Sequence, residues 1–74
     1  MESTVRHVHT YHDPETGHWW AESDDLPGLV SEAATLDALC DRVVAVVPDL
    51  LRASGYTGPG ITLAFVAERQ VEMA

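Results

Sequence analysis

Positive charge is scarce in this sequence of 74 residues. Four arginine or lysine side chains stand against twelve aspartates and glutamates, so the formal net charge is −8. A surface with this balance repels the phosphates of DNA and RNA, so we expect no direct binding of nucleic acid. The same field attracts basic proteins. An acidic module can therefore still act on nucleic acid by docking onto a basic partner.

Cysteine and long apolar runs are also lacking. The single Cys40 cannot form an internal disulfide, and no apolar stretch is long enough for a signal peptide or a membrane span. We therefore expect a cytoplasmic protein that does not bind membranes. Cys40 falls on the apolar side of a predicted helix, where a thiol is expected to behave as a small hydrophobe and not as a reactive or metal-ligating group.

The chain is short, and residues 1–74 are expected to form one small domain. A chain of this length buries only about 60% of the surface that its unfolded form exposes, so its core is thin. Self-association is a common remedy for a thin core. The sequence therefore predicts a homo-oligomer.

The first half of the sequence predicts a hairpin followed by a third strand. Residues 4–12 alternate in polarity, the letters DPETG spell a tight connection, and HWWAES forms the returning strand. A loop from Pro14 to Gly17 sets the register. The pairs expected from it are Asp13 with His18, Tyr11 with Trp20, and His9 with Glu22. After the turn DDLPG, the letters LVSEA form the third strand.

The second half predicts one helix and one strand. Thr35 is the expected N-cap, Asp37 lies in the first turn, and Gly55 is placed to end the helix. Pro48 falls on the polar side, where we expect a kink or a restart. The apolar arc of this helix comprises Leu36, Leu39, Cys40, Val43, Val44, Val46, Val47, Leu50 and Leu51. The letters ITLAFVAERQV then form the last strand, residues 61–71.

These elements define an α+β domain of order β-β-β-α-β. A strand reached through a helix lies parallel to its neighbour, and the simplest place for it is beside the first strand. We therefore expect an antiparallel three-stranded meander, one added parallel strand, and a single helix packed on one face of the sheet.

The adjacent residues Trp19 and Trp20 must point to opposite faces of this sheet. Trp19 is assigned to the helix-covered core and Trp20 to the open face. An exposed tryptophan among other apolar and aromatic side chains is typical of a protein interface. The interaction face predicted from the register consists of Val5, His7, His9, Tyr11, His18, Trp20 and Glu22.

Histidines on this face raise the alternative of a Zn²⁺ site. Three imidazoles and one carboxylate could supply the ligands, but no Cys or His pair in the sequence has an established ligand spacing. We therefore expect no metal and no other cofactor, and we interpret the face as an association surface.

The stretch WWAESDDLPGLVSEAATLDAL resembles the HicB-like antitoxin superfamily. The matching features are DPETGHWWAES, the acidic turn from Asp24 to Gly28, the strand LVSEA, the helix start at Thr35 and Leu36, and the segment VVPDLL. The resemblance implies a partial RNase H-like fold that neutralises a small basic ribonuclease toxin. Full members add a C-terminal DNA-binding domain, for which the sequence up to Ala74 has no room. The expectation is a small stand-alone member.

A relationship to RNase H also raises a nuclease hypothesis, because nucleases of that fold hold metal ions with several carboxylates. The candidates are Asp13, Asp24 and Asp25. Each lies at a turn, where aspartate favours local hydrogen bonds to the backbone, so we interpret them as turn residues. We expect a non-enzymatic, antitoxin-type interaction module. The alternatives are an orphan self-associating domain without a toxin partner and a degenerate RNase H-like nuclease.

Overall fold

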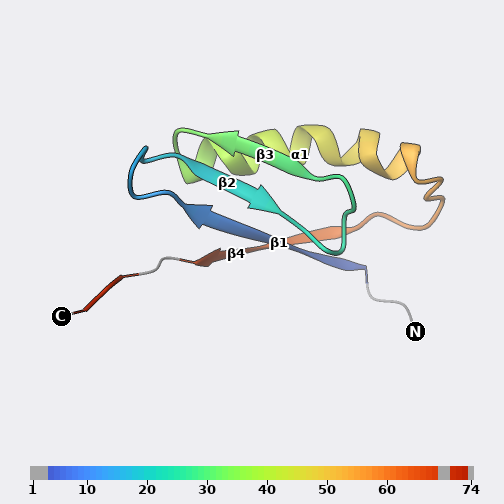
Figure 1. The fold of residues 1–74 in the computed structure, drawn as a ribbon. Helices are drawn as coiled ribbons and strands as arrows, with labels where there is room; N and C mark the ends of the chain where they lie inside the picture. Colours follow the sequence, from blue (N-terminus) through green and yellow to red (C-terminus); the bar gives the residue numbers. More distant parts are fainter. Residues whose placement is uncertain (1–3, 69–70, 74) are drawn as a thin grey trace.

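The computed structural model describes residues 4–68 and 71–73, and the elements follow the order predicted from the sequence (Figure 1). The α+β arrangement β-β-β-α-β is therefore confirmed. Its elements are β1 (Val5–His12), β2 (Trp19–Glu22), β3 (Val30–Ala33), α1 (Leu36–Ala53) and β4 (Thr62–Glu68).

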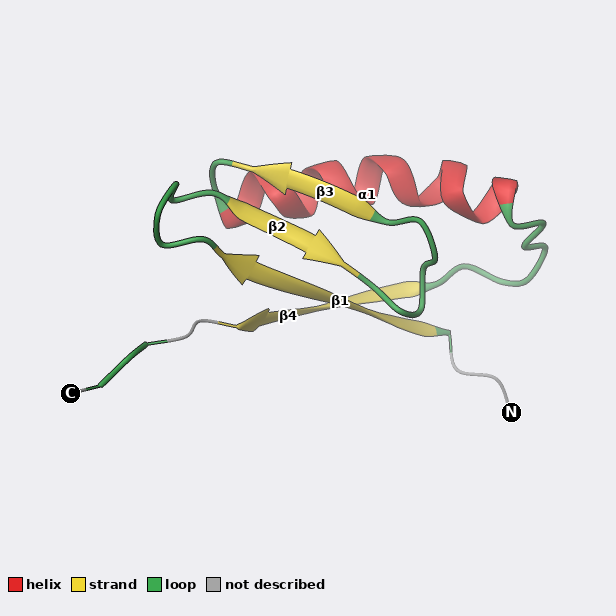
Figure 2. Cartoon of the chain, viewed as in Figure 1, coloured by secondary structure: helices red, strands yellow, loops and turns green. Residues whose placement is uncertain are grey.

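The strands form one mixed sheet with the order β3-β2-β1-β4. β1 pairs antiparallel with β2, β2 pairs antiparallel with β3, and β4 lies parallel to β1 on its other side. The meander and the parallel strand beside the first strand are as predicted. Helix α1 covers one face of the sheet and leaves the other face open (Figure 2).

The first hairpin has the predicted register. Tyr11 lies opposite Trp20 and His9 opposite Glu22. The backbone N–H of Asp13 donates to the carbonyl of His18 at 2.9 Å, which closes the loop from Pro14 to Gly17. Gly17 has φ of 76°, a conformation that glycine adopts without steric cost. Because a slip by one residue would exchange the two faces, this register determines which side chains are exposed.

Both ends of α1 are capped by the predicted residues. The Thr35 hydroxyl accepts a hydrogen bond from the backbone N–H of Ala38 at 3.1 Å. At the other end Gly55 has φ of 76°, and the backbone N–H of Tyr56 donates to the carbonyl of Leu51 at 2.9 Å. This bond turns the chain away from the helix in a Schellman motif.

Pro48 does not restart the helix, because α1 continues through it from Leu36 to Ala53. The proline deprives only the Val44 carbonyl of its helical donor, and Val44 is 56% exposed, so water can reach that position. Val47 is buried and Leu50 packs against the core, so contacts on both sides of Pro48 hold the helix to the sheet. No helix among the described residues combines the length and apolarity that crossing a bilayer requires.

The core lies between α1 and the sheet. The hydroxyl of Thr10, which is fully buried, donates to the Val66 carbonyl at 3.1 Å and so satisfies the polar group within the core. The buried apolar residues are Val8, Ala21, Leu26, Leu29, Ala33, Leu39, Val43 and Val47.

The buried strip of α1 is narrower than the predicted apolar arc. Val44 is 56% and Val46 39% exposed, although both were expected to face the sheet. The helix packs chiefly against β2 and β3, and each of these strands has only four residues. Two strands this short contact only the central strip of the helix surface. The residues on either side of this strip remain in contact with water.

Strand β4 ends earlier than predicted, and its residues Leu63 and Phe65 pack against the core but are only half-buried. It ends at Glu68 and does not reach Val71, and residues 69–70 of the predicted strand lie outside the described residues. Its neighbour β1 separates it from β2 and β3, on which α1 packs (Figure 1). The radius of gyration is 13.6 Å, against about 11 Å for a compact chain of this length. The molecule is therefore elongated.

Candidate functional site

The face of the sheet opposite α1, called the open face below, carries the residues predicted to form the interaction surface. Alternation along β1 and β2 and the pairing between them place Val5, His7, His9 and Tyr11 beside Trp20 and Glu22. His18 joins them through its side chain, which contacts Glu32 on β3 at 2.7 Å. The structure thus places the whole predicted set on the open face, spread along the length of β1.

An aromatic pair flanked by carboxylates crosses the open face in a single row. The strand pairings align Glu32, Trp20, Tyr11 and Glu68 across β3, β2, β1 and β4. The rings of Tyr11 and Trp20 are stacked, with centroids 4.3 Å apart and planes inclined by 20°. Trp20 is 38% exposed, so water reaches part of this stack. We call these four residues the aromatic row.

Trp19 lies on the other face, as predicted. Its side chain is half-buried and packs against the core cluster, and its ring contacts that of His12 with centroids 4.9 Å apart. The two neighbouring tryptophans therefore have different environments. Trp19 contributes to the core, whereas Trp20 is partly exposed on the open face.

Carboxylates surround the Tyr11 hydroxyl. This hydroxyl donates a hydrogen bond to Glu22 Oε1 at 3.1 Å, which fixes the orientation of the ring. The pKa of Tyr11 is raised above its ordinary value, first by partial burial, then by the hydrogen bond to Glu22 and by the charges of Glu22, Glu68 and Asp24. The open face therefore carries a negative potential beside its aromatic stack.

The imidazoles of this face have separate surroundings. His7 Nδ1 lies 3.4 Å from Asp25 Oδ2, and His18 Nδ1 lies 2.7 Å from Glu32 Oε1. The Nδ1 atom of His9 is buried and has no hydrogen-bond partner among the described residues. Within residues 4–68 and 71–73, no three His, Cys, Asp or Glu side chains come together in a group that could hold a metal ion.

Two of the three aspartates considered for a nuclease site, Asp13 and Asp25, have structural contacts. Asp13 Oδ1 accepts from the backbone N–H of Glu15 at 2.9 Å, and this bond is the main cause that lowers the pKa of Asp13. Asp25 Oδ2 accepts from the backbone N–H of His7 at 2.8 Å, which likewise lowers the pKa of Asp25. The bond of Asp13 is local, as predicted. That of Asp25 is not, because it reaches β1, 18 residues earlier in the chain.

The distance along β1 separates these aspartates. Asp25 lies beside His7, and Asp13 follows the end of the same strand, six positions further on. At about 3.3 Å per residue this amounts to roughly 20 Å. Two metal ions that cooperate in phosphoryl transfer lie only about 4 Å apart. Asp13 and Asp25 therefore do not belong to one such centre.

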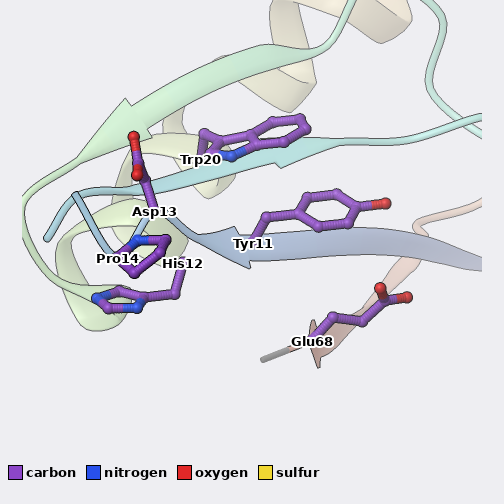
Figure 3. A pocket seen from close by; sticks show the side chains of 6 residues that line it. All are labelled: Tyr11, His12, Asp13, Pro14, Trp20 and Glu68. Atoms are coloured by element: carbon purple, nitrogen blue, oxygen red, sulfur yellow. The ribbon is translucent and has the colours of Figure 1, made fainter. Parts of the chain in front are cut away.

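A hollow of about 350 Å³ adjoins the aromatic row at the end of β1. Figure 3 shows Tyr11 between Trp20 and Glu68. The face predicted from the sequence does not include Glu32 and Glu68, because the pairing of β3 with β2 and of β4 with β1 decides that they lie beside the aromatic pair. The alternation of side chains along β3 and β4 indicates only on which side of its strand each glutamate lies. The residues that line the hollow are Tyr11, His12, Asp13, Pro14, Trp20 and Glu68.

Cys40 is half-buried on α1. Burial, followed by the charges of Asp37 and Asp41, raises the pKa of its thiol. The thiol form therefore predominates at neutral pH, as expected for a cysteine that packs as a small hydrophobe.

Comparisons with known proteins identify a family without an assigned activity. No curated protein matches the chain. Among solved structures, the chain is similar to the hypothetical protein TTHA1013 from the extremely thermophilic bacterium Thermus thermophilus. The two sequences are 38% identical over 93% of this chain and 99% of that one, with a TM-score of 0.80. Residues 5–74 match the domain of unknown function DUF1902, and the chain therefore belongs to that family.

Proposed function

We propose that this chain is a HicB-like, antitoxin-type interaction module that binds a small basic ribonuclease in the cytoplasm and covers its RNA-binding surface. The observation that carries the proposal is the aromatic row, in which a stacked Tyr11–Trp20 pair lies between Glu32 and Glu68 on an uncovered sheet face. The sequence resemblance to HicB-like antitoxins supplies the class of partner.

The open face has the composition of a docking surface for such a partner. Tryptophan and tyrosine are enriched at interface hot spots. The net charge of −8 accelerates the encounter with a basic protein and discriminates against acidic ones. A standard interface takes about 800 Å² from each partner, which is roughly a seventh of the 5473 Å² of accessible surface. One sheet face of a domain this small can supply that area.

The proposal is non-enzymatic because two of the three candidate carboxylates, Asp13 and Asp25, hold backbone N–H groups and lie far apart. Asp25 holds the backbone of His7, and Asp13 caps its own loop at the far end of β1. The negative field also repels RNA. Assays of RNA cleavage with the isolated chain test this part, and cleavage that requires Mg²⁺ and disappears in Asp25→Asn would contradict it.

The partner is tested by affinity capture of the tagged chain from its native cytoplasm, at about 50 mM and about 500 mM salt. We expect a small basic protein at low salt and its loss at high salt, because screening shortens the reach of surface charges to a few Å. The captured protein is then assayed for RNA cleavage with and without one equivalent of the chain. RNA cleavage that is unchanged at a saturating concentration of the chain would contradict the antitoxin role. Recovery of the tagged chain alone would contradict the claim that it has a basic partner.

A second candidate function, self-association without a toxin, is favoured by β4. This strand forms one edge of the sheet. Helix α1 packs chiefly on β2 and β3, which β1 separates from β4. Its apolar residues Leu63 and Phe65 face the helix side yet are only half-buried. An open strand edge beside such residues is a common site of pairing between chains. A second copy that pairs with β4 and so extends the sheet would cover the strand edge and the side chains of Leu63 and Phe65.

Sedimentation velocity at tens of micromolar tests this second candidate. Ala67 is exposed on β4, so Ala67→Asp should leave the monomer folded while placing a charge where a second copy would pack. We expect a wild-type dimer that Ala67→Asp dissociates and that the matched variant Ala34→Asp, at an exposed position before α1, preserves. A wild-type monomer would exclude self-association at these concentrations.

A further inference from the structure

We propose that the hollow beside Tyr11 and Trp20 is a binding site for the guanidinium group of an arginine side chain from a basic partner protein. The inference deepens the proposed function and rests on it. It is carried by the aromatic row, by the volume and lining of the hollow, and by the carboxylates that border it.

The aromatic stack supplies a surface for a planar cation. Trp20 on β2 covers one side of the Tyr11 ring, and Glu68 on β4 lies across the other side of β1 (Figure 3). The hollow of about 350 Å³ includes both rings and the Glu68 side chain in its lining. A guanidinium group is planar, is more weakly hydrated than an ammonium group, and stacks on aromatic faces. It therefore fits this hollow better than a lysine ammonium does.

The carboxylates supply acceptors for its donors. Glu68 and Asp13 belong to the lining of the hollow, and Glu22 accepts from the Tyr11 hydroxyl and so holds the ring in place. A guanidinium presents five N–H donors in a fixed fork and pairs with a carboxylate through two parallel hydrogen bonds. In the hollow, an aromatic ring would stack on the plane of the guanidinium, and the carboxylates at its edges would accept hydrogen bonds from the N–H groups.

A different protein, and not a second copy of this chain, is the occupant favoured by charge. Two copies would each bring a net charge of −8 to the contact. Two of the three described arginines also have other contacts, since the Arg6 guanidinium lies 6.0 Å from the centroid of the Tyr56 ring and Arg52 pairs with Asp49. A basic protein brings arginines without this repulsion.

The test uses the full chain labelled with ¹⁵N and three synthetic peptides in which serine alternates with arginine, lysine or citrulline. The indole N–H signals of Trp20 and Trp19 are followed by NMR, so that Trp19 serves as an internal control. We expect the arginine peptide to shift the Trp20 signal and to bind about three to ten times more tightly than the lysine peptide. The uncharged citrulline peptide should not bind measurably.

Two variants separate the site from general attraction between opposite charges. Glu68→Gln should weaken binding of the arginine peptide about three- to tenfold. Asp41→Asn removes the same charge at an exposed position of α1 and should weaken it less than about twofold. Equal binding of the arginine and lysine peptides, a shift at Trp19 in place of Trp20, or equal losses in the two variants would overturn the inference.

The outcomes also separate this site from the proposed function. Arginine selectivity at Trp20 without any basic protein in the capture experiment would leave the site standing and refute the antitoxin role. Capture of a basic ribonuclease that binds Glu68→Gln and Asp41→Asn equally well would refute the site and leave the role standing. A Trp20 shift that depends on the concentration of the chain itself, without peptide, would identify a second copy as occupant and overturn the choice of partner.

Discussion

Two adjacent valines of α1 provide a matched test of how the helix lies on the sheet. Val43 is fully buried and Val44 is 56% exposed, although the apolar pattern of the sequence does not distinguish them. We consider the substitutions Val43→Ala and Val44→Ala. Both remove the same atoms from the same helix turn, so the effect on helix propensity, at most about 0.7 kcal/mol in favour of alanine, is shared.

The difference in burial gives the expected magnitudes. At Val43 the loss of two methyl groups from the core costs about 1.6 kcal/mol in transfer free energy, and the residual cavity adds about 1 kcal/mol. After the gain in helix propensity, Val43→Ala should lower the free energy of unfolding by about 2 kcal/mol. At Val44 less than half of the transfer term applies and no cavity forms, so Val44→Ala should change the stability by less than about 0.5 kcal/mol.

Thermal unfolding followed by circular dichroism measures both variants. For a domain of this size, 2 kcal/mol corresponds to a decrease in Tm of roughly 10 °C. Measurements at two protein concentrations, tenfold apart, show whether a second copy contributes. A concentration-independent decrease for Val44→Ala as large as that for Val43→Ala would refute the placement of the helix.

Three further outcomes follow from local geometry. Gly55→Ala should cost about 1 kcal/mol in unfolding free energy because Gly55 has φ of 76°, whereas Gly60→Ala, at a glycine without positive φ, should cost less; equal Tm values would contradict the Schellman cap. Asp25→Asn should lower the urea midpoint at pH 7 and flatten its decline between pH 5 and pH 3. The folded pKa of Asp25 is lowered, so its ionised form stabilises the fold above about pH 4 and this contribution is lost as the pH falls through the folded pKa; Asp24→Asn is the control, and an unchanged pH profile in Asp25→Asn would contradict it. Cys40 should react with iodoacetamide at pH 7 more slowly than free cysteine, since the pKa of its thiol is raised, and equal rates would contradict its placement.

The parts of the fold that depend on local chemistry could be predicted from the sequence. The cap at Thr35, the helix end at Gly55 and the loop from Pro14 to Gly17 each follow from the conformational preferences of a few neighbouring residues. The register of the hairpin followed from that loop. With the register known, the separation of Trp19 from Trp20 also followed, because neighbouring residues of a strand face opposite sides.

The parts that depend on how far one element covers another could not be predicted. Periodicity assigns Val44 and Val46 to the apolar side of α1, but the width of the sheet beneath the helix decides whether they are buried. In the same way, the sequence places Glu68 on the same side of its strand as Val66 without showing that it lies beside Tyr11. That neighbour depends on the parallel register of β4, which a long crossover connection leaves open.

The central claim, that the open face binds a basic protein through the aromatic row, is tested most directly by calorimetric titration of the captured partner with wild-type chain, Trp20→Ala and Asp41→Asn. Removing Trp20 takes away a side chain that is 38% exposed and stacked on Tyr11, whereas Asp41→Asn changes charge on the opposite side of the sheet. The account predicts a Kd for Trp20→Ala that is at least about thirtyfold weaker than for the wild type, as for a hot spot of about 2 kcal/mol or more, and a change of less than about threefold for Asp41→Asn. Equal affinity of the wild type and a folded Trp20→Ala variant would contradict it.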